Sequence, residues 1–331
     1  MRWLIDLLPP MCIVLGLSVT LAFQTAALAP LHADNERAFH SFSNGIEEYR
    51  DFKVAWRTRL LANFGAAEVA RWNDRFAQQR NDEASALEWT IASWTVLWFA
   101  LLGLMYVHAA GRRSIFYLFG AFSALLFGYT PSVERIYPWD LPIVVIFTAF
   151  LILYVRKKYW LIAAVLPLGM GFKETSAVLC LAFFFTEQSW TRRLVLLTVS
   201  LSACLAVKTA IDIYVDVPIP FFTMEYAREG GEDPTRLHLL RNLRSLLNLD
   251  LVPVLANGGT LLAFMLLPSL NRTVKGLKLV SLAFLAGIFL FANIGEFRIF
   301  FETIPFALYA LELFSYGDSC LDRSADQYET T

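Results

Sequence analysis

The chain has 331 residues, of which 57% are hydrophobic and 17% are charged. Soluble domains contain about 45–50% apolar and about 25% charged residues, so the composition indicates an integral membrane protein. The 28 basic and 29 acidic residues nearly cancel, which excludes a disordered chain and binding of nucleic acid through bulk positive charge. The four cysteines are scattered without a CxxC pair, so we expect neither a disulfide framework nor a zinc knuckle.

Apolar runs long enough to cross a bilayer recur along the chain. They lie at 3–28, 89–108, 114–130, 139–155, 194–215, 250–268, 277–294 and 299–315. The stretch 159–188 is also apolar, but Lys173 and Glu174 interrupt its middle. One long helix would bury both charges near the centre of the bilayer, which is expensive. We therefore predict two antiparallel half-helices, 159–171 and 175–188, and an all-α bundle of about ten membrane segments.

The distribution of basic residues predicts the orientation of this bundle. With two half-helices and the N-terminus inside, the short cytoplasmic connections carry ten basic residues and the short outer connections carry three. The ten are Arg112, Arg113, Arg156, Lys157, Lys158, Arg192, Arg193, Arg272, Lys275 and Lys278, and the three are Arg135, Lys173 and Arg298. The positive-inside rule then places both termini in the cytoplasm. We expect one transmembrane domain, 1–315, in a bacterial inner membrane, and a polar cytoplasmic tail, 316–331. A cleaved signal peptide is the alternative for the first run and leaves the later orientation unchanged.

Two long loops, 29–88 and 216–249, then lie outside the cytoplasm. In the first, aromatic and aliphatic residues recur at helical spacing, which predicts amphipathic helices lying on the membrane surface. The stripe consists of Tyr49, Phe52, Trp56, Leu60 and Phe64. In the second loop, Asp233 and Pro234 resemble the start of a helix, and a leucine stripe follows.

Charged residues in or beside the spans gather at the outer ends of several segments. They are Asp34, Glu36, Glu134, Arg135, Asp140, Lys173, Glu174, Lys208, Asp212, Glu296, Arg298 and Glu302. From residue 89 onward, we expect every acidic residue near a span to lie on this side except Glu187. Charged groups in a membrane usually face a cavity or a partner, so the set predicts a polar cavity open to the outer face. The alternative is that each residue lies at a wet membrane edge, and Lys208 and Asp212 suit a structural ion pair.

Four short motifs resemble those of the GT-C class of integral-membrane glycosyltransferases, which use polyprenyl-phosphate-linked sugars. ADNERAF at 33–39 resembles the acidic stretch that opens the first outer loop, and GMGFKETSAVL at 169–179 is similar to a half-helix turn of these enzymes. YPWDLP at 137–142 and EFRIFFETIP at 296–305 resemble motifs of small bacterial members. The chain differs in that Asp34 and Glu36 are separated by Asn35, and no large soluble C-terminal domain follows the spans.

The resemblance implies an inverting transfer of a hexose or pentose from a polyprenyl-phosphate donor to a lipid-linked or glycan acceptor. Such an enzyme serves cell-envelope or polysaccharide biosynthesis. A carboxylate acts as general base, with Asp34 as the first candidate, Glu36 as the second, and Asp140 orienting the acceptor or sharing this role. Fixed lysine and arginine side chains stabilise the negative charge of the leaving phosphate. Glutamate side chains hold these cations in place or accept hydrogen bonds from sugar hydroxyls. The cationic candidates are Arg57, Arg59, Lys173 and Arg298, and the acidic ones are Glu134, Glu174, Glu296 and Glu302.

We expect no bound metal or other cofactor, although His32, Asp34, Glu36 and His40 contain metal-ligating groups. The partners implied are the donor, the acceptor and membrane lipid, without nucleic acid. Two other functions remain open. A transporter or flippase for a lipid-linked sugar or other solute could use the same cavity, although the chain shows no internal repeat. A polysaccharide polymerase or ligase would also act at this face, but its large outer loop usually comes late in the chain.

Overall fold

A computed structural model of the chain describes residues 2–28, 39, 59–78, 83–129, 137–216, 242–243, 247, 260–291 and 297–322. These residues form helices and connecting turns, without a strand. The α-helices are α1 (Arg2–Leu28), α5 (Leu60–Gln78), α6 (Glu83–Ala110), α7 (Ser114–Tyr129), α8 (Asp140–Val155), α9 (Tyr159–Phe172), α10 (Trp190–Tyr214), α13 (Arg272–Phe291) and α14 (Ile304–Tyr316). The 3₁₀ helices are η2 (Gly111–Arg113), η3 (Glu174–Phe185), η5 (Phe297–Thr303) and η6 (Cys320–Asp322).

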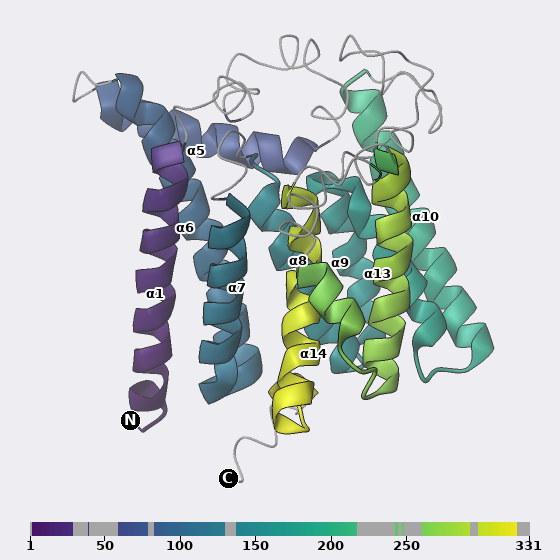
Figure 1. Ribbon diagram of the computed structural model, residues 1–331. Coiled ribbons are helices and arrows are strands. Elements are labelled where there is room, and N and C mark those ends of the chain that lie inside the picture. The colour runs from purple at the N-terminus through teal and green to yellow at the C-terminus, as the bar shows by residue number, and fades with distance from the viewer. Residues whose placement is uncertain are drawn as a thin grey trace.

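The long helices run side by side, and α5 lies across one end of them (Figure 1). We name this end the α5 end. Helix α1 begins and α14 finishes at the other end, which we name the terminal end (Figure 1). Helix α8 is the centre of the bundle, since fourteen of its sixteen residues are buried. A helix that is apolar on every side is stable only when other helices surround it, and α6, α9 and α14 pack against α8.

Three helices within the described residues are long and apolar enough to cross a membrane. They contain the segments Pro9–Ala27, Leu87–Ala110 and Trp190–Tyr214, which correspond to three of the predicted spans. Shorter apolar helices occupy other predicted positions, among them α8, α9 and η3. The structure therefore indicates an all-helical membrane protein, and the total of about ten segments stays a prediction.

The predicted break at Lys173 is present. Helix α9 ends at Phe172, Lys173 has an extended backbone with φ −163° and ψ 137°, and η3 begins at Glu174. The two short helices pack against each other. The second half-helix differs from the expected form, because its twelve residues adopt 3₁₀ geometry. The residues at the turn therefore belong to two separate helices, and neither charge lies in the middle of one long span.

Within the first long loop, 29–88, the main element that the structure describes is helix α5. The predicted stripe from Tyr49 falls largely outside the described residues, and α5 begins at Leu60 and continues to Gln78. One side of α5 carries the fully buried alanines Ala62, Ala66 and Ala70, whose small side chains allow close packing against α6. The side chains of Phe64 and Trp72 are exposed, as expected for a helix at a membrane surface. Most of the helix predicted in the second long loop lies outside the described residues.

Gly169 permits the close approach of the two half-helices. A Cβ atom at this position would lie 2.5 Å from the Ser176 Oγ atom and 2.9 Å from a methyl of Ile146. We expect Gly169→Ala to destabilise the protein by about 1–3 kcal/mol, since a well-packed core resists added volume. Gly287→Ala is the control, because no described residue lies within 4 Å of its added Cβ. Thermal unfolding of both variants in detergent measures the difference, and equal melting temperatures would contradict the packing argument.

Candidate functional site at the α5 end

The chain enters α8 through a turn that Asp140 closes. The Asp140 Oδ2 atom accepts the N–H of Tyr137 at 3.0 Å, and the Asp140 N–H donates to the Tyr137 carbonyl oxygen at 3.1 Å. Trp94 of α6 donates its Nε1–H to the carbonyl oxygen of Pro138 at 2.8 Å, and the rings of Tyr137 and Trp139 stack with centroids 4.6 Å apart. Asp140, which the sequence suggested as a catalytic candidate, is buried here and holds Trp139 in place.

Arg59 lies against this turn, directly before α5. The centre of its guanidinium group is 4.2 Å from the centroid of the Trp139 ring, a cation–π distance. Its Nε atom is 3.7 Å from Glu174 Oε2 at the start of η3. Within the described part of the chain, this Nε atom is buried and has no hydrogen-bond partner. The Trp139 ring and the Glu174 carboxylate thus position Arg59, while its Nε–H has no acceptor among the described residues.

Lys173 and Glu302 form a buried ion pair between the half-helix turn and η5. The Lys173 Nζ atom is 2.6 Å from Glu302 Oε1, and Thr175 Oγ1 donates to the same oxygen at 2.8 Å. Lys173 is 6% exposed and Glu302 is fully buried. Burial of two charges costs several kcal/mol per ion unless good geometry and further hydrogen bonds compensate. Here the direct pair and the threonine hydroxyl provide that compensation for one of the two carboxylate oxygens.

Several buried polar atoms on these segments have no hydrogen-bond partner among the described residues. They are Arg59 Nε, Trp98 Nε1, Ser176 Oγ and Glu302 Oε2. Trp98 packs edge-on against Phe172, with centroids 5.3 Å apart, so it borders the same turn. Buried polar groups are nearly always satisfied in folded proteins, and unsatisfied ones are costly in a low-dielectric interior. The α5 end therefore has polar groups that a polar ligand or water can satisfy.

The other residues predicted for the site fall outside the part of the chain that the structure describes. Asp34, Glu36, Arg57, Glu134 and Glu296 are in this group, and the side chain of Arg298 joins them. The structure brings together Arg59, Lys173, Glu174 and Glu302, and Arg59 packs on Trp139, which directly precedes Asp140 in the chain. Four of the eight charged residues predicted to bind the substrate thus lie together, and they come from three separate segments.

Lys208 and Asp212 of α10 contact each other. The Lys208 Nζ atom donates to Asp212 Oδ1, one helical turn away, and both residues are buried. Their geometry agrees with the structural ion pair that the sequence suggested as an alternative.

A second buried acidic site, which the sequence patterns do not indicate, lies at the terminal end. Glu312 of α14 is fully buried, and Tyr117 donates its hydroxyl to Glu312 Oε2 at 2.6 Å. Ser319 donates to the same oxygen, Cys320 Sγ lies 2.9 Å from Oε1, and Arg113 lies 3.5 Å from Oε1. The expectation that acids near the spans from residue 89 onward gather at the outer end, Glu187 excepted, is therefore wrong for Glu312.

The cluster around Glu312 orders residues that the sequence assigned to a polar tail. Gly317 adopts φ 74° at the end of α14, a conformation that favours glycine, and the chain turns back so that Cys320 is buried. A hydrogen bond to Asp318 raises the pKa of Arg113. Burial, followed by the hydrogen bond with Glu312, raises the pKa of the Cys320 thiol. Glu312 thus binds Ser319 and Cys320, and Arg113 binds Asp318, so residues 318–320 are held against α7 and α14.

Comparison of the chain with models of protein families, with curated proteins and with solved structures finds no match.

Proposed function

We propose that the chain is a membrane glycosyltransferase that takes a sugar from a polyprenyl-phosphate donor and works at the α5 end. The observation that supports this most is the buried Lys173–Glu302 pair beside Arg59 and Glu174. Two cations held by acids at one end of an apolar bundle suit a substrate with a phosphate head and a hydrocarbon tail. The lipid tail would lie along the apolar helices while the phosphate meets the cations.

The proposed orientation places the α5 end outside the cytoplasm. Basic side chains concentrate at the terminal end, where Arg113, Arg156, Arg193 and Arg272 lie near the ends of helices. The positive-inside rule assigns such an end to the cytoplasm. We infer that the donor reaches the site from the outer leaflet and that the acceptor approaches from outside.

The proposed reaction is a single displacement at the anomeric carbon of the sugar. The acceptor hydroxyl oxygen forms a bond to that carbon while the bond from the carbon to the phosphate oxygen breaks. The proton passes from the hydroxyl to a carboxylate, for which Asp34 and Glu36 are the candidates from the sequence. The electron pair leaves with the lipid phosphate, whose growing negative charge Arg59 and Lys173 stabilise. The Oε2 atom of Glu302 has no hydrogen-bond partner within the described residues, so it can accept a hydrogen bond from a sugar hydroxyl.

The experiment is a transfer assay with purified protein in detergent. Polyprenyl-phosphate glucose, mannose and arabinose serve as donors, lipid extracts of the producing cells serve as acceptors, and released polyprenyl phosphate is measured. We expect Asp34→Asn or Glu36→Gln to reduce release by about 10²-fold or more, the contribution expected of a general base. Glu68→Gln is the matched control, because the one contact of the Glu68 carboxylate among the described residues is a surface ion pair with Arg71 on α5. This pair is 2.6 Å long, and both side chains are 39% exposed.

The outcomes separate the proposed enzyme from the alternatives. Detergent micelles have no sealed compartment, so a transporter releases no polyprenyl phosphate in this assay. A polymerase or ligase lengthens or transfers a glycan from a lipid-linked oligosaccharide and leaves the monosaccharide donors intact. Full activity of both Asp34→Asn and Glu36→Gln in folded protein would refute the assignment of the base.

A further inference from the structure

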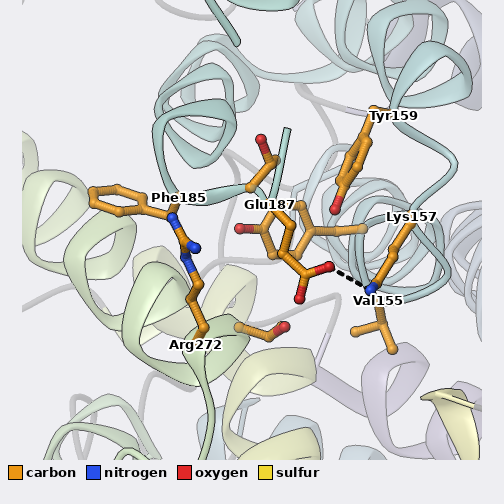
Figure 2. Close-up of a pocket in the computed structure, with 9 residues that line it drawn as sticks. Val155, Lys157, Tyr159, Phe185, Glu187 and Arg272 are labelled. Atoms are coloured by element: carbon orange, nitrogen blue, oxygen red, sulfur yellow. Dashed lines mark hydrogen bonds and ion pairs between the residues drawn. The ribbon is translucent and has the colours of Figure 1, made fainter. Parts of the chain in front are cut away.

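A small pocket lies at the terminal end, between the ends of α8 and η3 and the beginning of α13. It is lined by Tyr154, Val155, Lys157, Tyr159, Phe185, Thr186, Glu187, Arg272 and Thr273. In Figure 2, Arg272 approaches from one side and Lys157 from the other, with Glu187 between them. The pocket encloses about 270 Å³ including the open space at its mouth. Because this space includes open solvent, the pocket is a small polar recess that can contact one small group at its mouth.

Most arginines at this end are committed to partners in the protein. Arg156 donates to the carbonyl oxygen of Ala109 at 3.0 Å, and Arg193 donates to the carbonyl oxygens of Gln188 and Phe184. Arg192, which is exposed, donates to the Gln188 side chain at 3.0 Å. The contacts of Arg156 and Arg193 satisfy carbonyl oxygens near helix ends, and all three arginines have partners within the protein.

Arg272 differs from these arginines. It lines the pocket, yet within the described residues it makes no hydrogen bond and no close ion pair. Its guanidinium group presents a fork of donors that matches the oxygens of a phosphate. The hydroxyl groups of Tyr159 and Thr273 add further polar atoms to the lining, whereas the Thr186 hydroxyl already donates to the Phe183 carbonyl oxygen at 3.0 Å.

Lys157 is held in a backbone conformation that normally belongs to glycine. Its φ is 58°, its N–H donates to the Tyr154 carbonyl oxygen, and the N–H of Lys158 donates to the Leu153 carbonyl oxygen. This is the pattern in which a helix ends with a left-handed residue, usually glycine. A lysine in such a position costs backbone strain, which points to a function for its side chain.

The Lys157 side chain neutralises the one acid of the pocket. Its Nζ atom lies 2.5 Å from Glu187 Oε2. This hydrogen bond, and to a smaller extent the nearby charge of Arg272, lowers the pKa of the Glu187 carboxyl. The charges of Lys157 and Glu187 cancel. The lining of the pocket therefore has a net charge of +1, which comes from Arg272. Two exposed tryptophans, Trp160 and Trp190, begin helices at the same end, and exposed tryptophans mark the level of lipid headgroups.

We propose that this pocket binds one phosphate group, held by Arg272 and the adjoining hydroxyls, at the depth of the lipid headgroups. The group can belong to an anionic phospholipid of the cytoplasmic leaflet or to free phosphate. The pocket is independent of the transfer reaction proposed for the α5 end, since its residues lie at the opposite end of the bundle.

The test compares Arg272→Gln with Arg192→Gln, the matched arginine outside the pocket. One arm counts phosphatidylglycerol molecules retained by purified protein in native mass spectrometry, with phosphatidylcholine as the neutral lipid. The second arm titrates inorganic phosphate and follows thermal stabilisation. We expect Arg272→Gln to lower the affinity for the phosphate group about tenfold and Arg192→Gln to leave this affinity unchanged. Glu187→Gln removes the acid and frees Lys157, so binding is expected to tighten about threefold.

Each outcome decides the proposal. Retention of phosphatidylglycerol without a response to inorganic phosphate identifies the lipid as the source, and the reverse identifies free phosphate. Equal losses in the two arginine variants mean that surface charge alone attracts the anion, which overturns the proposal. Absence of binding in both arms, or weaker binding in Glu187→Gln, overturns it as well.

Discussion

Replacing Lys173 with methionine is expected to destabilise the protein by about 3–5 kcal/mol, because it leaves the Glu302 carboxylate buried without its cation. Glu302 is fully buried, and its remaining described donor is the Thr175 hydroxyl at 2.8 Å. Thermal denaturation in detergent, followed by loss of the monodisperse peak in size-exclusion chromatography, measures the effect. Lys275→Met is the control, since Lys275 is exposed on α13, and we expect no loss there.

The double variant Lys173→Met with Glu302→Gln separates a structural role of this pair from a functional one. Removal of both charges of a buried pair is often close to neutral, so most of the lost stability is expected to return. If the pair also serves the proposed transfer, the double variant stays inactive although it is folded. Recovery of both stability and activity would show that the pair only holds η5 against the half-helix turn.

The second large effect is expected for Glu312→Ala. The substitution leaves the Tyr117 and Ser319 hydroxyl donors buried without their acceptor and removes one partner of Arg113. We expect a loss of about 3–5 kcal/mol and release of residues 318–320 from α7 and α14. Ser319→Ala removes the hydrogen bond that Ser319 Oγ donates to Glu312 and the one that it accepts from the Leu321 N–H. It keeps the carboxylate and its Tyr117 donor, so it is expected to cost only about 1–2 kcal/mol.

Labelling of Cys320 reports this release directly. The thiolate is the reactive form of cysteine, and burial together with Glu312 raises the pKa of the Cys320 thiol. In a Cys12→Ser background, which removes the exposed cysteine, a water-soluble maleimide should label Cys320 slowly at pH 7. The Glu312→Ala variant should label at a rate close to that of the protein unfolded in SDS. Rapid labelling before the substitution would refute the buried arrangement.

The sequence predicted the segments better than the contacts between them. Lys173 and Glu174 predicted the break after α9, because charges interrupt an apolar run there. The partner of Lys173 could not be identified in the same way. Glu302 lies far along the chain, and only the packing of η5 against α8 and α7 brings it to the turn. Asp140 was recognised as a residue of this region, but its hydrogen bond to Tyr137 depends on turn geometry that spacing does not reveal.

Glu312 was missed because hydropathy averages over a window of residues. The surrounding segment ALELF is apolar enough to hide one acid, and its partners come from α7 and from beyond Gly317. The role of Arg272 was likewise hidden. It was counted among ten basic residues that set orientation, and nothing in the sequence distinguishes it from Arg192 or Arg193. Only the side-chain contacts show which arginines make hydrogen bonds within the protein.

The 3₁₀ geometry of η3 also determines how far this short segment reaches. Twelve residues advance about 24 Å at 2.0 Å per residue, but only about 18 Å as an α-helix. The longer form carries the chain most of the way across a hydrocarbon layer of about 30 Å. Three residues per turn also align Ser176, Leu179 and Ala182, all buried, in one straight row. A change of η3 to an α-helix would draw its ends together by about 6 Å and rotate this row away from its neighbours. The length of η3 therefore sets the distance between the polar turn at Lys173 and the terminal end.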